Sequence, residues 1–163
     1  MDFTPSRKLK RYWRVAVLAN IKDESQPKPE GVPPDAFADF DHIETIHHIQ
    51  AALESDGHET KFLMADRTLP QTVQEYAPDI CLNIAEGLGG DAREAHVPAL
   101  LEMLGIPYTG SRVLTNAISL DKTLTKRIWR DRRLPVAPFQ EFSVGDEPLR
   151  PDLKYPLFVK PAR

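Results

Sequence analysis

The chain of 163 residues is long enough for one full domain, or for one domain and part of a second. With 41% hydrophobic and 28% charged residues and a formal net charge of −3, it has an ordinary globular composition and lacks the basic excess of nucleic-acid-binding proteins. The single cysteine, Cys81, excludes a disulfide within the chain and predicts a buried thiol. No apolar run reaches the length of a membrane span, and the basic residues 1–12 lack the apolar core of a signal peptide. We therefore expect a cytoplasmic protein that has neither nucleic acid nor a membrane as its partner.

The first predicted strand leads into a long loop. Residues 13–20 are apolar and partly β-branched, which predicts a buried parallel strand. Residues 22–39 carry four prolines among acidic and polar side chains, a composition that cannot build a core and predicts a mobile loop. A loop of this length in a small domain is typical of function or of disorder.

A helix is predicted to begin at Asp41, whose carboxylate can cap the free backbone N–H groups, and to end at Gly57. Between them, four apolar side chains recur at helical spacing, which gives the helix one buried face. These are Ile43, Ile46, Ile49 and Leu53.

Strands and helices then alternate along the chain. Strands are predicted at residues 59–65 and 79–85, with a short fourth strand at 106–108. Helices are predicted between them at residues 68–76 and 93–104. Such alternation predicts an α/β fold built on a parallel sheet with right-handed crossovers.

The last third of the chain changes character. A helical segment is predicted at residues 114–118, and Asp121 is expected to cap a further helix that ends near residue 132. An extended linker at 134–139 and strands at 140–144 and 155–161 follow. We place a domain boundary near residue 134. Because about 30 residues rarely fold alone, the second domain is expected to be truncated at the end of the chain.

A glycine-rich turn follows the third strand. Gly87, Gly89 and Gly90 allow close approach of a ligand and can point backbone N–H groups at an anion, although a merely flexible loop would have the same composition. Glu86, at the strand end, is a candidate for binding an ammonium group, or a solvated loop acid. The turn matches neither the dinucleotide fingerprint nor the P-loop.

Two lysines are candidates for binding an anion. Lys122 lies in the first turn of a helix, where a cation is poorly placed unless it has an anionic partner. Lys160 ends an apolar run that predicts a buried strand, where a lysine usually serves a charged ligand. The alternatives are an exposed helix lysine and a lysine at a sheet edge whose stem lies along apolar surface.

The sequence offers no metal centre and no nucleophile. The five histidines lack the spacing of zinc ligands and have no cysteine partner, so a solvated helix face explains them better. There is no Gly-x-Ser-x-Gly motif either. We therefore assign neither a catalytic residue nor a metal ligand. The basic face of the helix after Asp121, with Lys122, Lys126 and Arg130, is interpreted as solvated.

Six motifs follow one another from the third strand to the end of the chain. They are Asn83-Ile84-Ala85-Glu86-Gly87, Arg93-Glu94-Ala95, Val97-Pro98-Ala99-Leu100-Leu101-Glu102, Leu104-Gly105-Ile106-Pro107-Tyr108-Thr109-Gly110-Ser111, Asp121-Lys122 and Phe158-Val159-Lys160-Pro161. Their order and spacing resemble the D-alanine–D-alanine ligase family of ATP-grasp enzymes, over most of the chain from Phe40 onward.

The resemblance implies a Rossmann-like domain at residues 13–120, a connecting helix at 121–133 and the opening strands of an ATP-grasp domain at 134–163. In that family the carboxylate of one amino acid attacks the γ-phosphate of ATP, with Mg²⁺ neutralising charge, and the amine of a second amino acid displaces phosphate. These ligases serve peptidoglycan synthesis for the cell wall, and their N-terminal domains commonly contribute to homodimers.

By the same resemblance, Lys122 and Lys160 contact the ATP phosphates. The amino-acid site would be shaped by the strand-end residues and the segment at 106–111. Its predicted members are Glu86, Gly87, Gly89, Gly90, Tyr108 and Ser111.

Two departures from the family pattern bear on function. Typical members have a Gly-Gly turn and a Ser-x-Glu segment after the first strand, whose glutamate binds the substrate ammonium; here Asp39, Asp41 or Glu44 would have to replace it. The chain also stops before the expected phosphate loop, so we expect no ligase activity from these 163 residues alone. The alternatives are a related ATP-grasp ligase for other amino acids or a peptide, and a binding or dimerisation module.

Overall fold

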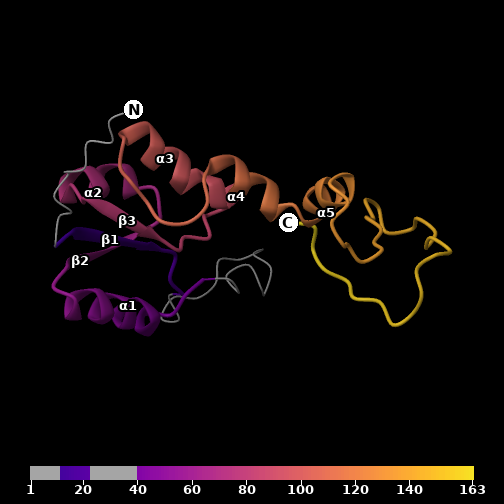
Figure 1. The fold of residues 1–163 in the computed structure, drawn as a ribbon, viewed down its shortest axis with the longest axis horizontal. Coiled ribbons are helices and arrows are strands. Elements are labelled where there is room, and N and C mark those ends of the chain that lie inside the picture. The colour runs from indigo at the N-terminus through magenta and orange to yellow at the C-terminus, as the bar shows by residue number, and fades with distance from the viewer. Residues whose placement is uncertain (1–11, 23–39) are drawn as a thin grey trace, which may run out of the picture.

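A three-stranded parallel sheet forms the centre of the computed structural model, which describes residues 12–22 and 40–163 (Figure 1). Strand β1 (Arg14–Ala19) lies between β2 (Glu59–Met64) and β3 (Ile80–Asn83). The predicted parallel α/β sheet is therefore confirmed. The basic lead-in and most of the proline-rich loop, Asp39 included, lie outside the described residues.

Five α-helices in the described residues lie close to the positions predicted from the sequence. The segment predicted at 93–104 divides into a short 3-10 helix, η1 (Arg93–Ala95), and the α-helix that follows it. The α-helices are α1 (Ile43–Ser55), α2 (Leu69–Tyr76), α3 (His96–Leu104), α4 (Val113–Leu120) and α5 (Lys122–Asp131). None of the helices in the described part of the chain is both long enough and apolar enough to cross a membrane.

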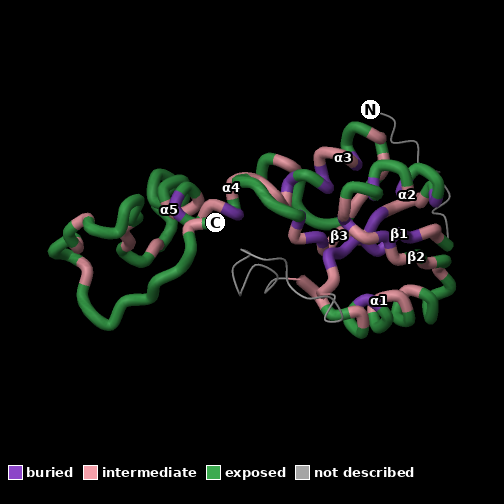
Figure 2. Tube along the Cα trace, turned by 180° about the vertical axis from the view of Figure 1, so that it is seen from behind, coloured by how far each residue is buried: buried purple, intermediate pink, exposed green. Residues whose placement is uncertain are grey.

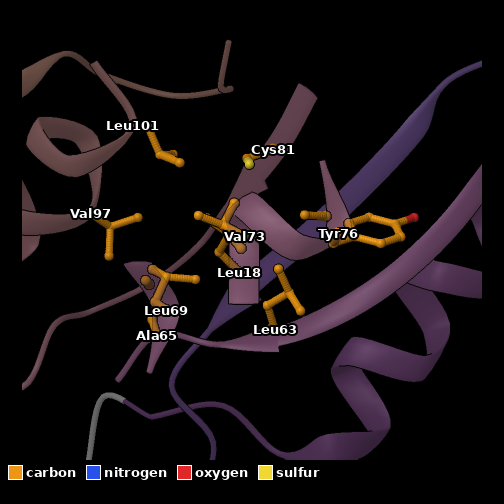
Figure 3. Close-up of a cluster of buried hydrophobic side chains, with 11 residues drawn as sticks. Leu18, Leu63, Ala65, Leu69, Val73, Tyr76, Cys81, Val97 and Leu101 are labelled. Carbon is orange, nitrogen blue, oxygen red and sulfur yellow. The ribbon is translucent and has the colours of Figure 1, made fainter. Parts of the chain in front are cut away.

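Helices cover both faces of the sheet because successive side chains of a strand point to opposite faces. Val17 of β1 is fully buried against Ile46 of α1 on one face. Leu18, the next residue, packs with α2 and α3 on the other face, where the larger cluster contains the thiol of Cys81 (Figure 3). Cys81 is buried, as predicted, and burial raises the pKa of its thiol to about 12.

The start of α1 differs from the prediction. His42, not Asp41, is the residue before the first helical residue, and no side chain caps the helix. Asp41 is instead held in an extended bridge beside Ile21. Its N–H donates to the Asn20 carbonyl at 2.9 Å, and its carbonyl accepts from the Lys22 N–H at 2.8 Å. This backbone pairing fixes Asp41 beside the end of β1, outside the helix.

The cap of α5 is as predicted. The Asp121 side chain accepts a hydrogen bond from the Leu124 N–H at 2.8 Å, which satisfies one of the unpaired donors of the first turn. Figure 1 shows that α4 carries the chain away from the sheet and that α5 and the residues after it lie to one side.

The short fourth strand predicted at 106–108 is reduced to a single bridge between Cys81 and Tyr108. The Cys81 N–H donates to the Pro107 carbonyl at 2.8 Å, and the Thr109 N–H donates to the Cys81 carbonyl at 2.9 Å. These two hydrogen bonds align residues 107–109 with β3. They bring Gly110 and Ser111 to the carboxyl end of that strand.

The prediction of strands at residues 140–144 and 155–161 was wrong. Residues 134–163 contain no strand and are largely exposed (Figure 2). The Glu147 carboxylate accepts hydrogen bonds from the N–H groups of Ser143, Val144 and Gly145, so these groups form a local turn instead of a ladder. Six prolines in the segment, each without an N–H donor, further oppose strand pairing.

Candidate functional site

A cavity of about 490 Å³ lies at the carboxyl ends of the strands, the edge at which open α/β sheets bind ligands. It is formed by the segment before α1, the start of α1, the end of β3 with the turn after it, η1, and the segment from Gly110 into α4. The lining residues are Asp41, Thr45, Ile49, Asn83, Ile84, Ala85, Glu86, Glu94, Gly110, Ser111 and Asn116.

Three carboxylates line this cavity, from Asp41, Glu86 and Glu94, and all three residues are half-buried. The described lining residues include no lysine, arginine or histidine. Hydroxyl and amide groups complete the polar lining. Such a wall favours a ligand that carries an ammonium group and donates hydrogen bonds.

Of the three acids proposed to replace the family's ammonium-binding glutamate, Asp41 is the one that lines the cavity. Glu44 is exposed on α1 and does not line it, and Asp39 lies outside the described residues. The extended bridge to residues 20–22 explains the difference, because it places Asp41 directly at the end of β1.

Asn20 organises the strand ends, a role that the sequence analysis missed. Its side chain is almost fully buried, and its amide donates to the Ala65 carbonyl after β2 at 2.8 Å. Its side-chain oxygen accepts from the N–H groups of Glu86 and Gly87 after β3, at 3.1 and 2.9 Å. One side chain thus ties together the ends of all three strands. The available signal was a polar residue directly after an apolar strand.

The glycine-rich turn differs from the predicted anion cradle. The Gly87 N–H is bound to Asn20, so it does not point at a ligand. Gly87 adopts a positive φ of +78°, and a Cβ atom there would lie 2.3 Å from the Arg93 carbonyl oxygen. Neither Gly87 nor Gly89 nor Gly90 lines the cavity. Gly87 therefore forms a tight turn next to Glu86, with its N–H bound to Asn20.

Glu86 and Ser111, both predicted site residues, are brought together in the cavity, but Tyr108 is not. The Tyr108 hydroxyl donates to the Glu102 carboxylate at 2.8 Å, and Arg112 pairs with the same carboxylate at 3.3 Å. These contacts lower the pKa of Glu102, chiefly through the Tyr108 hydrogen bond. Desolvation, and then the Glu102 hydrogen bond, raise the pKa of Tyr108. Tyr108 packs against the hydrophobic core, and its hydroxyl joins Glu102 and Arg112 in a hydrogen-bonded cluster.

The two predicted phosphate lysines do not line the cavity. Lys122 begins α5, and its backbone N–H donates to the Ala162 carbonyl at 2.9 Å. Lys160 is exposed, with its ammonium 5.0 Å from the centre of the Phe158 ring, so the expected buried setting was wrong. The predicted strand fails because Phe158 and Val159 are 85% and 91% exposed and face no other strand in the described residues. The bond to Ala162 nevertheless brings the Lys160 segment back to the start of α5.

The sequence analysis also missed the polar residues that complete the cavity. Asn83 ends β3, Asn116 lies on α4, and Thr45 and Glu94 lie on α1 and η1. Asn83 was visible as the polar end of an apolar strand. The other three belong to helices, and only the packing of those helices around the strand ends brings them together. Within residues 12–22 and 40–163, no group of three or more His, Cys, Asp or Glu side chains is arranged to hold a metal ion.

Comparison with known proteins gives relatives for most of the chain. No protein-family model matches it. It is 35% identical over 162 residues to the uncharacterized protein y4sG of Sinorhizobium fredii, covering 91% of this chain and 46% of that protein. It is 33% identical over 121 residues to D-alanine–D-alanine ligase of Moorella thermoacetica, covering 69% of this chain and 38% of the ligase. Over 96 residues it is 41% identical to D-alanine–D-alanine ligase of Desulforudis audaxviator, covering 59% of this chain and 31% of that ligase. The chain thus spans less than half the length of these relatives.

Solved structures give the same fold. The D-alanine–D-alanine ligase of Bacillus anthracis complexed with ATP superposes with a TM-score of 0.59 at 24% identity, over 86% of this chain and 43% of the ligase. A second structure of that enzyme gives a TM-score of 0.52 at 25% identity, over 74% of this chain and 34% of the ligase. The fold and the sequence relatives agree: the chain is D-alanine–D-alanine ligase-like and corresponds to the N-terminal part of such a ligase.

Proposed function

We propose that the chain is part of an ATP-dependent ligase that joins two amino acids through an acyl phosphate. The observation that carries this proposal is the acid-lined cavity at the strand ends, in a chain whose relatives include D-alanine–D-alanine ligases. We propose further that the whole protein works in the cytoplasm, on precursors of peptidoglycan, and as a homodimer; these three points rest on the resemblance.

The cavity would bind the first amino acid by its ammonium group. Asp41 and Glu86 line the cavity from two different segments, one before α1 and the other after β3. A carboxylate gives an ammonium group both opposite charge and hydrogen-bond acceptors, which together compensate its desolvation. Ser111 and Asn116 would then orient the substrate carboxyl group for reaction.

The proposed reaction has two steps. An oxygen of the first substrate's carboxylate forms a bond to the γ-phosphorus of ATP while the bond from that phosphorus to the bridging oxygen breaks, which releases ADP. The nitrogen of the second amino acid, after losing a proton, then bonds to the acyl carbon, and inorganic phosphate leaves. Such chemistry depends on positioning and on neutralisation of phosphate charge, the roles proposed for Lys122 and Lys160.

In that family Mg²⁺ neutralises charge on the phosphates. Because residues 12–22 and 40–163 hold no group of three or more His, Cys, Asp or Glu side chains arranged for a metal ion, we assign Mg²⁺ no ligand among these residues. We also propose that the 163-residue chain by itself does not complete the ligase reaction, because its two candidate phosphate lysines lie outside the amino-acid cavity.

The assignment of Lys160 to ATP phosphates is tested by titration calorimetry with Mg-ATP. We expect weak binding, because Lys160 is exposed, and we expect Lys160→Ala to weaken it by about tenfold through loss of a charge-assisted contact. Lys154→Ala, which removes an exposed lysine from the same segment, is the matched control and should leave the affinity unchanged. Equal affinities for Lys160→Ala and the parent chain, both folded, would contradict the assignment.

The role of Asp41 is tested by titration with D-alanine. We expect Asp41→Asn to weaken binding by about tenfold, since the amide keeps a hydrogen-bond acceptor but loses the charge that pairs with ammonium. Glu44→Gln, a neutralised acid at the first turn of α1 outside the cavity, should have little effect. A larger loss for Glu44→Gln than for Asp41→Asn would reverse the choice between the two acids. Binding of L-alanine but not D-alanine would favour a related ligase with another substrate.

A further inference from the structure

Arg163 joins two parts of the chain that are distant in sequence. Its guanidinium Nη1 lies 2.7 Å from Oδ1 of Asp91, at the end of the glycine-rich turn. Its Nε donates to Oδ2 of Asp121, the cap of α5, at 3.0 Å. The same arginine therefore contacts the loop after β3 and the start of the helix that carries Lys122.

The residue before it contributes a second connection. The Ala162 carbonyl accepts the N–H of Lys122, which is the first residue of α5 and has no partner within the helix. Two successive residues thus fasten the same segment, one by its main chain and one by its side chain. In Figure 1 this end of the chain lies beside the junction of α4 and α5.

Both carboxylate oxygens of Asp121 accept a hydrogen bond. Oδ1 accepts from the Leu124 N–H at 2.8 Å, while Oδ2 accepts from Arg163. These two bonds, the backbone one first, hold the pKa of Asp121 below its usual range. The Asp121 side chain is only 17% exposed, so its pair with Arg163 is less screened by solvent than the pair with Asp91.

We propose that Arg163 is a positioning residue. It fastens the segment at residues 157–163, which carries Lys160, to the start of α5 and to the glycine-rich turn, and so keeps Lys160 close to the end of α5 that carries Lys122. Without this contact, the exposed residues 157–161 have no cavity or strand in the described chain to hold them. The fastening follows from the contacts alone; that it serves a bound anion rests on the proposed function.

Residues 134–163 contain another arginine–aspartate ion pair, Arg150–Asp152, which differs from the Arg163 pairs in the parts of the chain that it joins. Arg150 and Asp152, 2.6 Å apart, are two residues apart in sequence, and the Arg150 guanidinium also donates to the Phe139 carbonyl at 3.1 Å, not to the start of α5 or to the glycine-rich turn. The arginine side chains are similarly exposed, at 45% for Arg163 and 47% for Arg150. Arg150→Gln is therefore a matched control for Arg163→Gln.

The fastening is tested by amide hydrogen exchange in the 163-residue chain without nucleotide, followed by NMR. The reporter is the Lys122 N–H, because its acceptor belongs to the fastened segment. Arg163→Gln is expected to speed its exchange about two- to fivefold, the range of a weak exposed ion pair, while the amides of β1 stay protected. Arg150→Gln should leave the Lys122 exchange rate unchanged, and Arg163→Lys should restore part of the protection. Unchanged Lys122 exchange in Arg163→Gln would overturn the inference.

The positioning role is tested separately with Mg-ATP. If the fastening serves the anion site, Arg163→Gln should also weaken Mg-ATP binding about two- to fivefold, while Arg150→Gln does not. Faster Lys122 exchange with unchanged Mg-ATP affinity would overturn the positioning role. Because the exchange experiment contains no nucleotide, its failure is distinguishable from failure of the proposed ATP site, which the Lys160→Ala titration reports.

Discussion

Replacing Gly87 with alanine is expected to destabilise the fold by about 3 kcal/mol, from backbone strain and overpacking together. Gly87 has a φ of +78°, a conformation that L side chains rarely adopt. The added Cβ would lie 2.3 Å from the carbonyl oxygen and 2.6 Å from the carbonyl carbon of Arg93. Because those atoms are main chain, η1 would have to move. Urea unfolding followed by circular dichroism measures the loss.

Gly89 supplies the matched control two residues along the same turn. A Cβ atom at Gly89 would meet nothing within 4 Å, and its φ is not in the left-handed range. We expect Gly89→Ala to change the free energy of unfolding by less than about 0.5 kcal/mol, as for an ordinary surface substitution. Equal losses at the two glycines would show that the turn, and not the contact with Arg93, limits stability.

Asn20→Ala is expected to cost about 3 kcal/mol, because it removes three hydrogen bonds at a buried position. The buried Gly87 N–H and the Ala65 carbonyl would lose their partner, which adds the cost of leaving buried polar groups unpaired. The turn that places Glu86 would also be released. We therefore expect weaker D-alanine binding in the same variant.

The control for Asn20 is Asn83, another asparagine at a strand end. Its side-chain oxygen accepts one long hydrogen bond, from the Ala85 N–H at 3.3 Å, and the residue is only half-buried. Asn83→Ala is expected to cost about 1 kcal/mol or less. Urea unfolding of both variants tests the difference. A cost for Asn20→Ala no greater than for Asn83→Ala would contradict the central role given to Asn20.

The sheet and helices were predictable because their signals are local. The apolar run of β1 and the helical spacing of Ile43, Ile46 and Ile49 each lie within one element, and the structure places these elements where the patterns predicted them. A strand-like pattern, however, forms a strand only when a neighbouring strand is available to pair with it. Residues 140–144 and 155–161 carry strand-like patterns, but no strand in the described residues pairs with them.

The candidate site was predictable only in part, for the same reason. Glu86 and Ser111 follow strand-like segments, so their place at the sheet edge could be inferred. The hydrogen bond of the Gly87 N–H could not be inferred, because its acceptor is the side chain of Asn20, 67 residues earlier in the chain. Nor could the sequence choose among Asp39, Asp41 and Glu44. That choice depends on the bridge between Asp41 and Ile21, which are 20 residues apart in the sequence.

That bridge also fixes the position of Asp41 through the main chain alone. The Asp41 N–H donates to the Asn20 carbonyl, and the Lys22 N–H donates to the Asp41 carbonyl, so residues 20–22 and Asp41 are held together at the sheet edge. Because both bonds are made by main-chain groups, they tolerate a change of the Lys22 side chain, provided that the new residue keeps its backbone N–H. Lys22→Pro would remove the donor of the second bond and so release Asp41 from the end of β1.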